Sequence, residues 1–128
     1  MRLLLDTHVL LWMPADDPRL SAPARERILD PAVDLLFSAA SYWEICLTIS
    51  IGKLRLAANR ERTIDREMTR NTVGWLPLEK RHLRMLPSLP WHHRDPFDRV
   101  LIAQAQADRL TILTSDAHIP RYDVPTAW

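Results

Sequence analysis

The stretch RLLLD at residues 2–6 sets a carboxylate, Asp6, directly after a short apolar run. A run of this length without polar interruptions is typical of a strand that is buried on both faces. The stretch LTILTSD at residues 110–116 has the same arrangement, with Asp116 shortly after a β-branched run. We therefore expect both acids at the carboxyl ends of strands.

Outward from these two stretches, helical patterns alternate with strand patterns. Further strands are expected over residues 35–37, over residues 73–78 and in the tail. Helices are expected over residues 7–13, 21–29, 59–73, 79–86 and 97–107, and a further helix is expected from Ser38 or Ser41 to about residue 51. This alternation predicts a single three-layer α/β domain over residues 1–128, with a mostly parallel sheet of four to five strands flanked by helices. In such sheets, ligands bind outside the carboxyl ends of the strands.

Composition narrows the class of protein. The net charge of +1 neither demands nor excludes a nucleic-acid partner. Cys46 is the only cysteine, which excludes an intramolecular disulfide and fits a reducing compartment. No apolar run is long enough to span a membrane, and Asp6 and His8 interrupt the apolar N-terminus where a signal peptide would continue. We expect a cytoplasmic protein.

Two further acids stand in early turns of predicted helices. The segment 41–44, SYWE, matches a capping box, which gives Glu44 an alternative structural role. However, Glu44 has apolar neighbours, among which a carboxylate needs a cation or hydrogen-bond donors. Pro96 favours Asp95 as the cap of the next helix. We therefore assign the chemistry to Asp98, whose alternatives are a favourable helix-dipole position or an ion pair with arginine.

Asp6 and Asp116 also have a structural alternative, because aspartate caps helices well. Taken together, the four acids would repel one another by roughly 3–4 kcal/mol per pair at close range. A multivalent cation would compensate this repulsion. Oxygen ligands without nearby cysteine favour Mg²⁺ or Mn²⁺. A metal held by carboxylates keeps positions open for water and phosphate, which is the equipment for phosphodiester hydrolysis.

At these acids the sequence resembles the PIN-domain nucleases, in particular the VapC-type toxins of bacterial toxin–antitoxin pairs. Four segments carry the resemblance in order along the whole chain: LLLDTHVLLW (3–12), SAASYWEI (38–45), HRDPFDRVLIAQA (93–105) and LTSD (113–116). The interval of 18 residues between Asp98 and Asp116 fits the family and favours Asp98 over Asp95.

The resemblance implies an endoribonuclease that depends on Mg²⁺ or Mn²⁺ and cleaves single-stranded or structured RNA. It also implies a homodimer and a cognate antitoxin that blocks the site. Asp6 and Asp98 become the best metal ligands, and Asp116 binds a second metal or acts through water. Glu44 orients or deprotonates the attacking water.

Several other side chains are assigned roles around this site. Thr7 and Thr114 are expected to donate hydrogen bonds to the carboxylates. An arginine stripe (Arg62, Arg66 and Arg70) recurs every four residues and, with Arg99, is a candidate for contact with RNA phosphates. The alternative for the stripe is a solvated helix with ion pairs one turn apart. His92 and His93 are candidate metal ligands or proton donors, but we interpret the proline-rich stretch around them as a connector.

Two other classes of function compete with a nuclease. A receiver-like signalling domain also has an acidic Mg²⁺ pocket, but it needs a lysine after its last strand, and neither Lys53 nor Lys80 is so placed. A non-catalytic PIN-like domain would bind nucleic acid or a partner without cleaving. Nothing in the residues reads a 2′-hydroxyl, so DNA stays open as a substrate.

Overall fold

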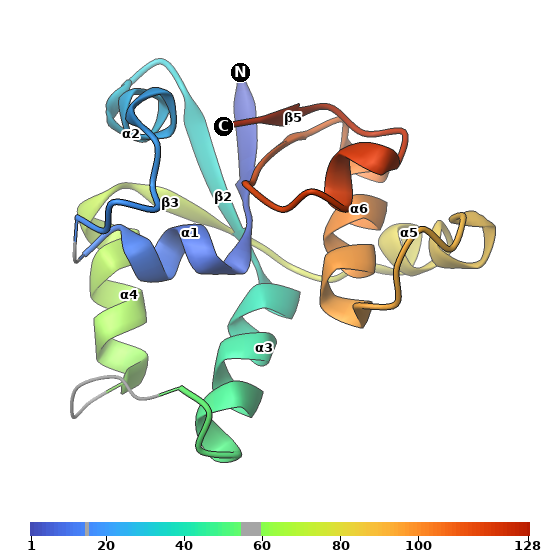
Figure 1. Cartoon of the computed structure of the whole chain (residues 1–128), viewed down its shortest axis with the longest axis horizontal. Coiled ribbons are helices and arrows are strands. Elements are labelled where there is room, and N and C mark those ends of the chain that lie inside the picture. The colour runs from blue at the N-terminus through green and yellow to red at the C-terminus, as the bar shows by residue number, and fades with distance from the viewer. Residues whose placement is uncertain (15, 55–59) are drawn as a thin grey trace.

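Five parallel strands form one sheet within the part of the chain that the structure describes (Figure 1). The structure is a computed structural model and describes residues 1–14, 16–54 and 60–128. The strand order is β3-β2-β1-β4-β5. The bounds are β1 (Arg2–Leu5), β2 (Asp34–Ser38), β3 (Val73–Leu76), β4 (Thr111–Leu113) and β5 (Thr126–Ala127). The predicted parallel sheet is confirmed.

β1 lies in the middle of the sheet, which explains its plain leucine sequence. All three of its leucines are fully buried, and the register pairs Leu5 with Leu113 of β4. The amide of Asp6 continues this ladder by donating to the carbonyl of Leu113 at 3.0 Å. Asp6 and Thr114, which follow the two strands, are therefore neighbours at the carboxyl edge of the sheet.

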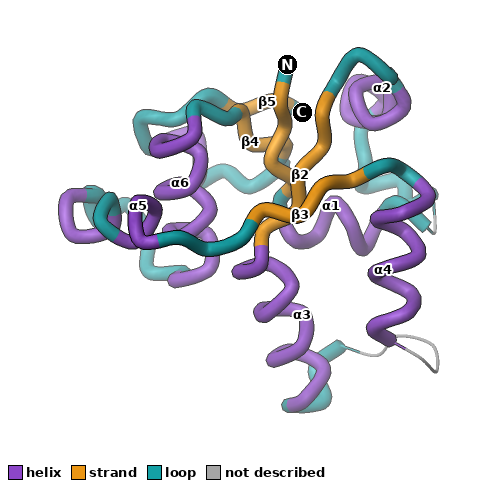
Figure 2. Tube along the Cα trace, turned by 180° about the vertical axis from the view of Figure 1, so that it is seen from behind, coloured by secondary structure: helices purple, strands orange, loops and turns teal. Residues whose placement is uncertain are grey.

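Helices cover both faces of the sheet and create three layers (Figures 1 and 2). Their bounds are α1 (Thr7–Trp12), α2 (Ala22–Leu29), α3 (Ala39–Ser50), α4 (Arg60–Arg70), α5 (Lys80–Leu83) and α6 (Pro96–Asp108). Leu3 and Leu5 of β1 pack in one core with residues of α1 to α4. Leu4 points the opposite way, into a second core with residues of α6. The alternation of side chains along β1 thus joins both cores.

The ends of the helices follow their capping residues. Ser21 caps α2 as predicted, because its hydroxyl accepts from the amide of Ala24 at 3.1 Å. α3 begins after Ser38 and not after Ser41, since the Ser38 side chain accepts from an amide in the first turn. Gly52 follows α3 with a φ of +76°, in the left-handed region that glycine adopts without strain.

Some predicted boundaries shift. β3 ends at Leu76 and not at residue 78, since Pro77 has no amide hydrogen to continue the ladder. The helix predicted over residues 79–86 is α5 followed by a separate 3-10 turn (Leu86–Ser88). α4 falls within the helix predicted over 59–73, of which residue 59 lies outside the described residues.

The helical spacing of Cys46 with Tyr42, Ile45 and Ile49 predicts that its side chain faces the core. This prediction is wrong, because the side chain is exposed. α3 extends beyond the sheet (Figure 1), and its buried side includes Ser41 and Ile45. Trp43 and Leu47 are left exposed with Cys46. In the described part of the chain, none of the helices has the length and apolar character needed to cross a bilayer.

Candidate active site

Asp6 comes from the middle of the sheet and is only 8% exposed. It occupies the cap position of α1, yet its side chain makes no capping hydrogen bond. Instead, one carboxylate oxygen accepts from the hydroxyl of Thr114 at 2.7 Å. The capping alternative therefore does not account for this acid, and the predicted role of Thr114 as a donor is confirmed.

Glu44 projects from α3 toward the start of α1. Its Oε1 accepts from the hydroxyl of Thr7 at 2.7 Å, and Thr7 also lies 2.8 Å from the hydroxyl of Ser41. Because α3 already begins after Ser38, the capping-box explanation of Glu44 is wrong. The predicted contact between Thr7 and a carboxylate is confirmed.

Asp95 caps α6, as the sequence predicts, and Asp98 faces the site. Asp95 Oδ1 accepts from the amides of Phe97 and Asp98, at 2.9 and 3.1 Å, and so caps α6. Asp98 lies in the first turn with 8% of its surface exposed. Its Oδ2 is 3.0 Å from Nε2 of His93. Asp98 is therefore the acid that the start of α6 presents to the site.

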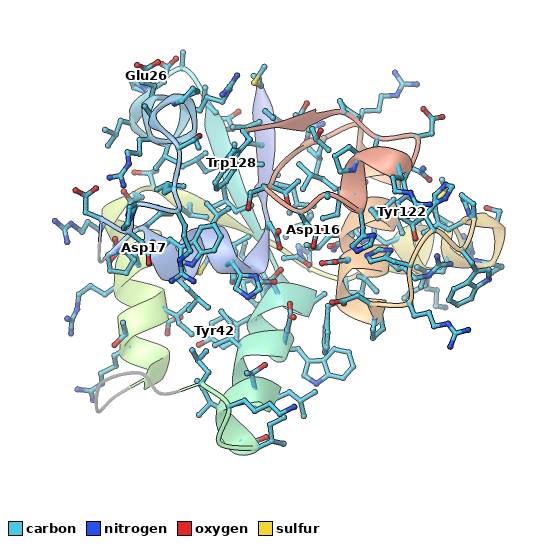
Figure 3. The ribbon with its side chains drawn as sticks, viewed as in Figure 1. Asp17, Glu26, Tyr42, Asp116, Tyr122 and Trp128 are labelled. Atoms are coloured by element: carbon cyan, nitrogen blue, oxygen red, sulfur yellow. The ribbon has the colours of Figure 1, made fainter. Side chains whose placement is uncertain are left out.

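Asp116 stands two residues after Thr114 in the loop that follows β4. Its amide donates to the Thr114 hydroxyl at 3.0 Å, and its Oδ1 accepts from the amide of His118 at 2.7 Å. Thr114 thus touches both Asp6 and Asp116. Figure 3 places Asp116 between α1 and α6, in front of the carboxyl edge of the sheet.

Burial and mutual repulsion raise the pKa values of Asp98, Asp6 and Glu44. Burial raises the pKa of Asp98 to about 8, and the charges of Asp95, Asp6, Asp116 and Glu44 add to the rise. Burial also raises the pKa of Asp6, with a contribution from Asp116, and that of Glu44, with contributions from Asp95 and Asp6. Acids from four separate segments therefore sense one another's charge at one place.

This donor set suits a hard divalent cation in charge and chemistry. Among the described residues, none of the four acids pairs with lysine or arginine. In the same part of the chain, no three acidic, histidine or cysteine side chains lie close enough together to hold an ion. Carboxylate oxygens without a cationic partner are the ligands that Mg²⁺ and Mn²⁺ prefer.

Sequence reasoning did not separate His93, which lies against Asp98, from His92 and favoured a connector for both. The ring of His93 also stacks on that of His118, with centres 5.2 Å apart and planes 14° apart. The surrounding loop is rich in proline and shows no periodicity, so nothing in it marked one histidine over the other. The available signal was the position of His93, five residues before Asp98 in the segment HRDPFD.

Arg99 does not present its charge to solvent as a phosphate contact should. It is 5% exposed, and its guanidinium donates to the carbonyls of Leu89 and Pro90 and to the Tyr122 hydroxyl. It also stacks on Trp91, 3.7 Å from the ring centre. These internal contacts make Arg99 a support for the loop that precedes α6, which corrects its assignment as a substrate contact.

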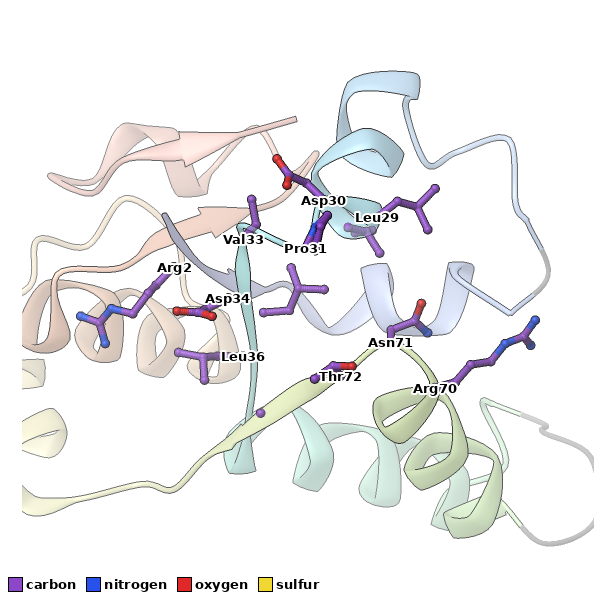
Figure 4. A pocket seen from close by; sticks show the side chains of 13 residues that line it. Arg2, Leu29, Asp30, Pro31, Val33, Asp34, Leu36, Arg70, Asn71 and Thr72 are labelled. Atoms are coloured by element: carbon purple, nitrogen blue, oxygen red, sulfur yellow. The ribbon is translucent and has the colours of Figure 1, made fainter.

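The arginine stripe lies on a helix that carries none of the four acids. Its three residues are exposed on α4, which packs against α1 and β3, whereas Asp98 is on α6. Arg70 also lines a hollow of about 670 Å³ with Arg2 and Asp34, at the amino ends of the strands (Figure 4). That end of the sheet is opposite the carboxyl edge. Contact between the stripe and RNA stays a prediction.

Comparison with known proteins gives a family match over most of the chain. The family model described as PIN domain matches residues 3–125. None of the curated proteins is similar enough in sequence to match.

Solved structures with similar folds cover nearly the whole chain. VapBC2 from Rickettsia felis, bound to a DNA fragment from their promoter, gives a TM-score of 0.75 at 12% identity, over 99% of this chain and 98% of that one. VapBC-1 from nontypeable Haemophilus influenzae gives 0.68 at 17% identity, over 99% and 97%. FitAcB from Neisseria gonorrhoeae gives 0.60 at 17% identity, over 97% and 95%. At these identities the likeness shows the fold.

Proposed function

Because this chain belongs to the PIN domain family, we propose that it is a metal-dependent endoribonuclease that acts as the toxin of a toxin–antitoxin pair. One observation carries the proposal above the others. Buried and half-buried carboxylates from distant segments lie at the carboxyl edge of the sheet, and burial together with the charges of these neighbours raises the pKa of Asp98 to about 8. An ordinary structural site would relieve this repulsion with lysine or arginine, and a divalent cation relieves it equally well.

Asp6, Asp98 and Asp116 are the proposed ligands of Mg²⁺ or Mn²⁺, with Asp116 binding a second ion or acting through water. When bound, the ion supplies the positive charge that stabilises the phosphoryl oxygens in the transition state. Thr114 positions two of these ligands, because its hydroxyl donates to Asp6 and accepts from the amide of Asp116. The separation of the two acids is therefore set by one side chain.

Glu44 is the proposed base. The Thr7 hydroxyl fixes one of its oxygens, and burial raises its pKa above that of a free glutamate. A raised pKa makes the ionised carboxylate a stronger base toward water. Glu44 takes a proton from the attacking water while the new bond to phosphorus forms and the bond to the leaving oxygen breaks on the opposite side.

RNA as the substrate, an antitoxin and a second copy of the chain as partners are also parts of the proposal. Two of the structurally similar proteins carry the name VapBC, and the sequence of this chain resembles the VapC-type toxins of toxin–antitoxin pairs. By analogy with them, we propose that a cognate antitoxin binds this chain and blocks its site, and that the chain forms a homodimer in the cytoplasm.

A non-catalytic binding module is the second candidate. The observation in its favour is that, among the described residues, no three metal-ligating side chains are already gathered. Such a module would bind RNA equally well with and without a divalent ion, and it would leave the strand intact. A cleavage assay separates the two candidates.

The test incubates purified protein with a mixed RNA pool in Mg²⁺, in Mn²⁺ and in EDTA, beside a matched single-stranded DNA. We expect cleavage of RNA only with the divalent ion, and a loss of several powers of ten in rate for Asp6→Asn and Asp98→Asn. Asp34→Asn is the control, since Asp34 is an exposed carboxylate at the amino end of β2, opposite the edge where the four acids lie. Cleavage in EDTA, or cleavage unchanged by both substitutions, would overturn the mechanism.

A further inference from the structure

His93 joins Asp98 to a buried polar network behind the site. Its Nε2 is 3.0 Å from Oδ2 of Asp98, and its Nδ1 is 2.8 Å from the hydroxyl of Tyr122. Figure 3 shows Tyr122 beside α6. The end of the network at Tyr122 is shielded from solvent, because Tyr122 is only 4% exposed. One imidazole therefore spans the distance between a buried phenol and a proposed metal ligand.

The hydrogen bonds around Tyr122 decide which way its own proton points. Arg99 Nη1 and the backbone amide of His93 both approach the phenol oxygen at 3.2 Å. Both groups can only donate, so they occupy the two lone pairs of the phenol oxygen. The hydroxyl proton is then left for an acceptor, and Nδ1 of His93 is nearer than its carbonyl, which is 3.4 Å away.

This arrangement fixes the tautomer of His93. A neutral imidazole has one N–H and one bare nitrogen, and Nδ1 must be bare to accept from Tyr122. The proton therefore resides on Nε2, where it points at Oδ2 of Asp98.

We propose that His93 is a positioning residue for Asp98, held in its Nε2–H form by Tyr122 and Arg99. The donated hydrogen bond holds Oδ2 and sets the rotation of the carboxylate, so that Oδ1 is presented to the cation. Arg99 is anchored in turn by the carbonyls of Leu89 and Pro90. The loop that resembles a connector is thus the support of a metal ligand.

The inference rests on the proposed function, because it needs Asp98 to bind a divalent ion. Partners that orient a metal ligand typically change metal affinity by about 10–100-fold when removed. If His93 had a purely structural role, substituting it would change the stability of the loop, and it would not matter which of its two ring nitrogens the new side chain replaced. The experiment therefore treats the two nitrogens separately.

The first measurement uses metal-free protein and needs no activity. Long-range ¹H–¹⁵N spectra of the uniformly labelled protein at about pH 7.5 distinguish the two neutral tautomers of each histidine. We expect His93 to be protonated on Nε2 in the wild type and to lose this fixed form in Tyr122→Phe. His93 protonated on Nδ1 in the wild type would overturn the proposal.

The second measurement is the affinity for Mn²⁺, followed by electron paramagnetic resonance. In His93→Gln, the amide nitrogen replaces Nε2 and can still donate to Asp98. In His93→Asn, the shorter side chain replaces Nδ1 and reaches only toward Tyr122. We expect the asparagine variant to bind Mn²⁺ about 10-fold or more weakly and the glutamine variant to recover most of the affinity. His92→Gln, in the same loop, is the control and should bind as the wild type does.

The outcomes separate this inference from the function on which it rests. Equal affinities of the glutamine and asparagine variants would overturn the role of His93 and leave the metal site in place. If the wild-type protein binds no Mn²⁺, the proposed metal site is wrong. His93 then has no metal ligand to position. Thermal unfolding of each variant shows that the compared proteins are folded.

Discussion

Replacing Asp98 by asparagine should stabilise the metal-free protein, and only at high pH. Asparagine resembles the protonated carboxyl, and its carbonyl can still accept from His93. Because the folded pKa of Asp98 is raised from 3.8 to about 8, the folded protein keeps a proton that the unfolded chain has released. The wild type therefore loses stability as the pH rises from about 4 to about 8, and the variant does not.

The magnitude follows from the pKa. The difference between 3.8 and about 8, at about 1.4 kcal/mol for each pH unit, corresponds to about 6 kcal/mol. Asp98 keeps 8% of its surface exposed, and side-chain movement with entering water relieves part of this cost. We expect the variant to be more stable than the wild type by about 2–3 kcal/mol at high pH and equally stable near pH 4.

Urea unfolding in EDTA, followed by circular dichroism at about pH 4.5 and 8.5, measures both differences. Asp108→Asn is the matched control on the same helix. The pKa of Asp108 is lowered to about 2, chiefly by its hydrogen bond from Arg81, so its contribution is present above pH 3.8 and is lost as the pH falls toward 2. This control should be less stable than the wild type at pH 8.5, whereas Asp98→Asn should be more stable than the wild type at that pH.

A gain for Asp98→Asn that is the same at both pH values would refute the electrostatic reasoning. The same holds if the variant is destabilised at about pH 8.5. Added Mg²⁺ gives a second check, because an ion that binds the folded state stabilises it. The wild type should gain stability from Mg²⁺ and overtake the variant, while the variant should gain little.

Three shorter predictions concern other parts of the molecule. Thr114→Val removes the donor to Asp6 and should weaken Mn²⁺ binding about 10-fold, measured by calorimetry, with the fold intact. If the arginine stripe contacts RNA phosphates, alanine at all three positions should reduce the slope of log affinity against log salt by about 2 in filter binding, whereas an unchanged slope would exclude the stripe. Cys46 should react with a thiol reagent in the native protein, and protection until urea is added would contradict its exposure.

The sequence predicted the sheet, and the position of Asp6 and Asp116 after its strands, because both depend on local pattern. A plain leucine run requires burial on both faces, and this pattern alone predicts that Asp6 lies at the carboxyl end of an inner strand. Asp98 was separable from Asp95 because proline at residue 96 fixes the helix start. These inferences use only residues that are close together in the sequence, and over such short distances the propensity for helix or strand is informative.

What the sequence could not supply depends on contacts between distant segments. The segment SYWE matches a capping box, but α3 begins three residues earlier, where the helix meets β2. His93 sits in a loop without periodicity, and its role depends on Tyr122, which lies 29 positions later in the chain. Arg99 resembled a surface charge because nothing local shows that Trp91 and two carbonyls enclose it.

β1 leaves the ribosome long before the strand that completes its carboxyl end. Its partner on that side is β4, so the early part of a growing chain holds Asp6 and Glu44 without Asp98, Thr114 or Asp116. Folding cannot assemble the cluster until translation has passed residue 116. If the chain is the nuclease we propose, this strand order keeps an unfinished copy harmless to the message from which it is being translated.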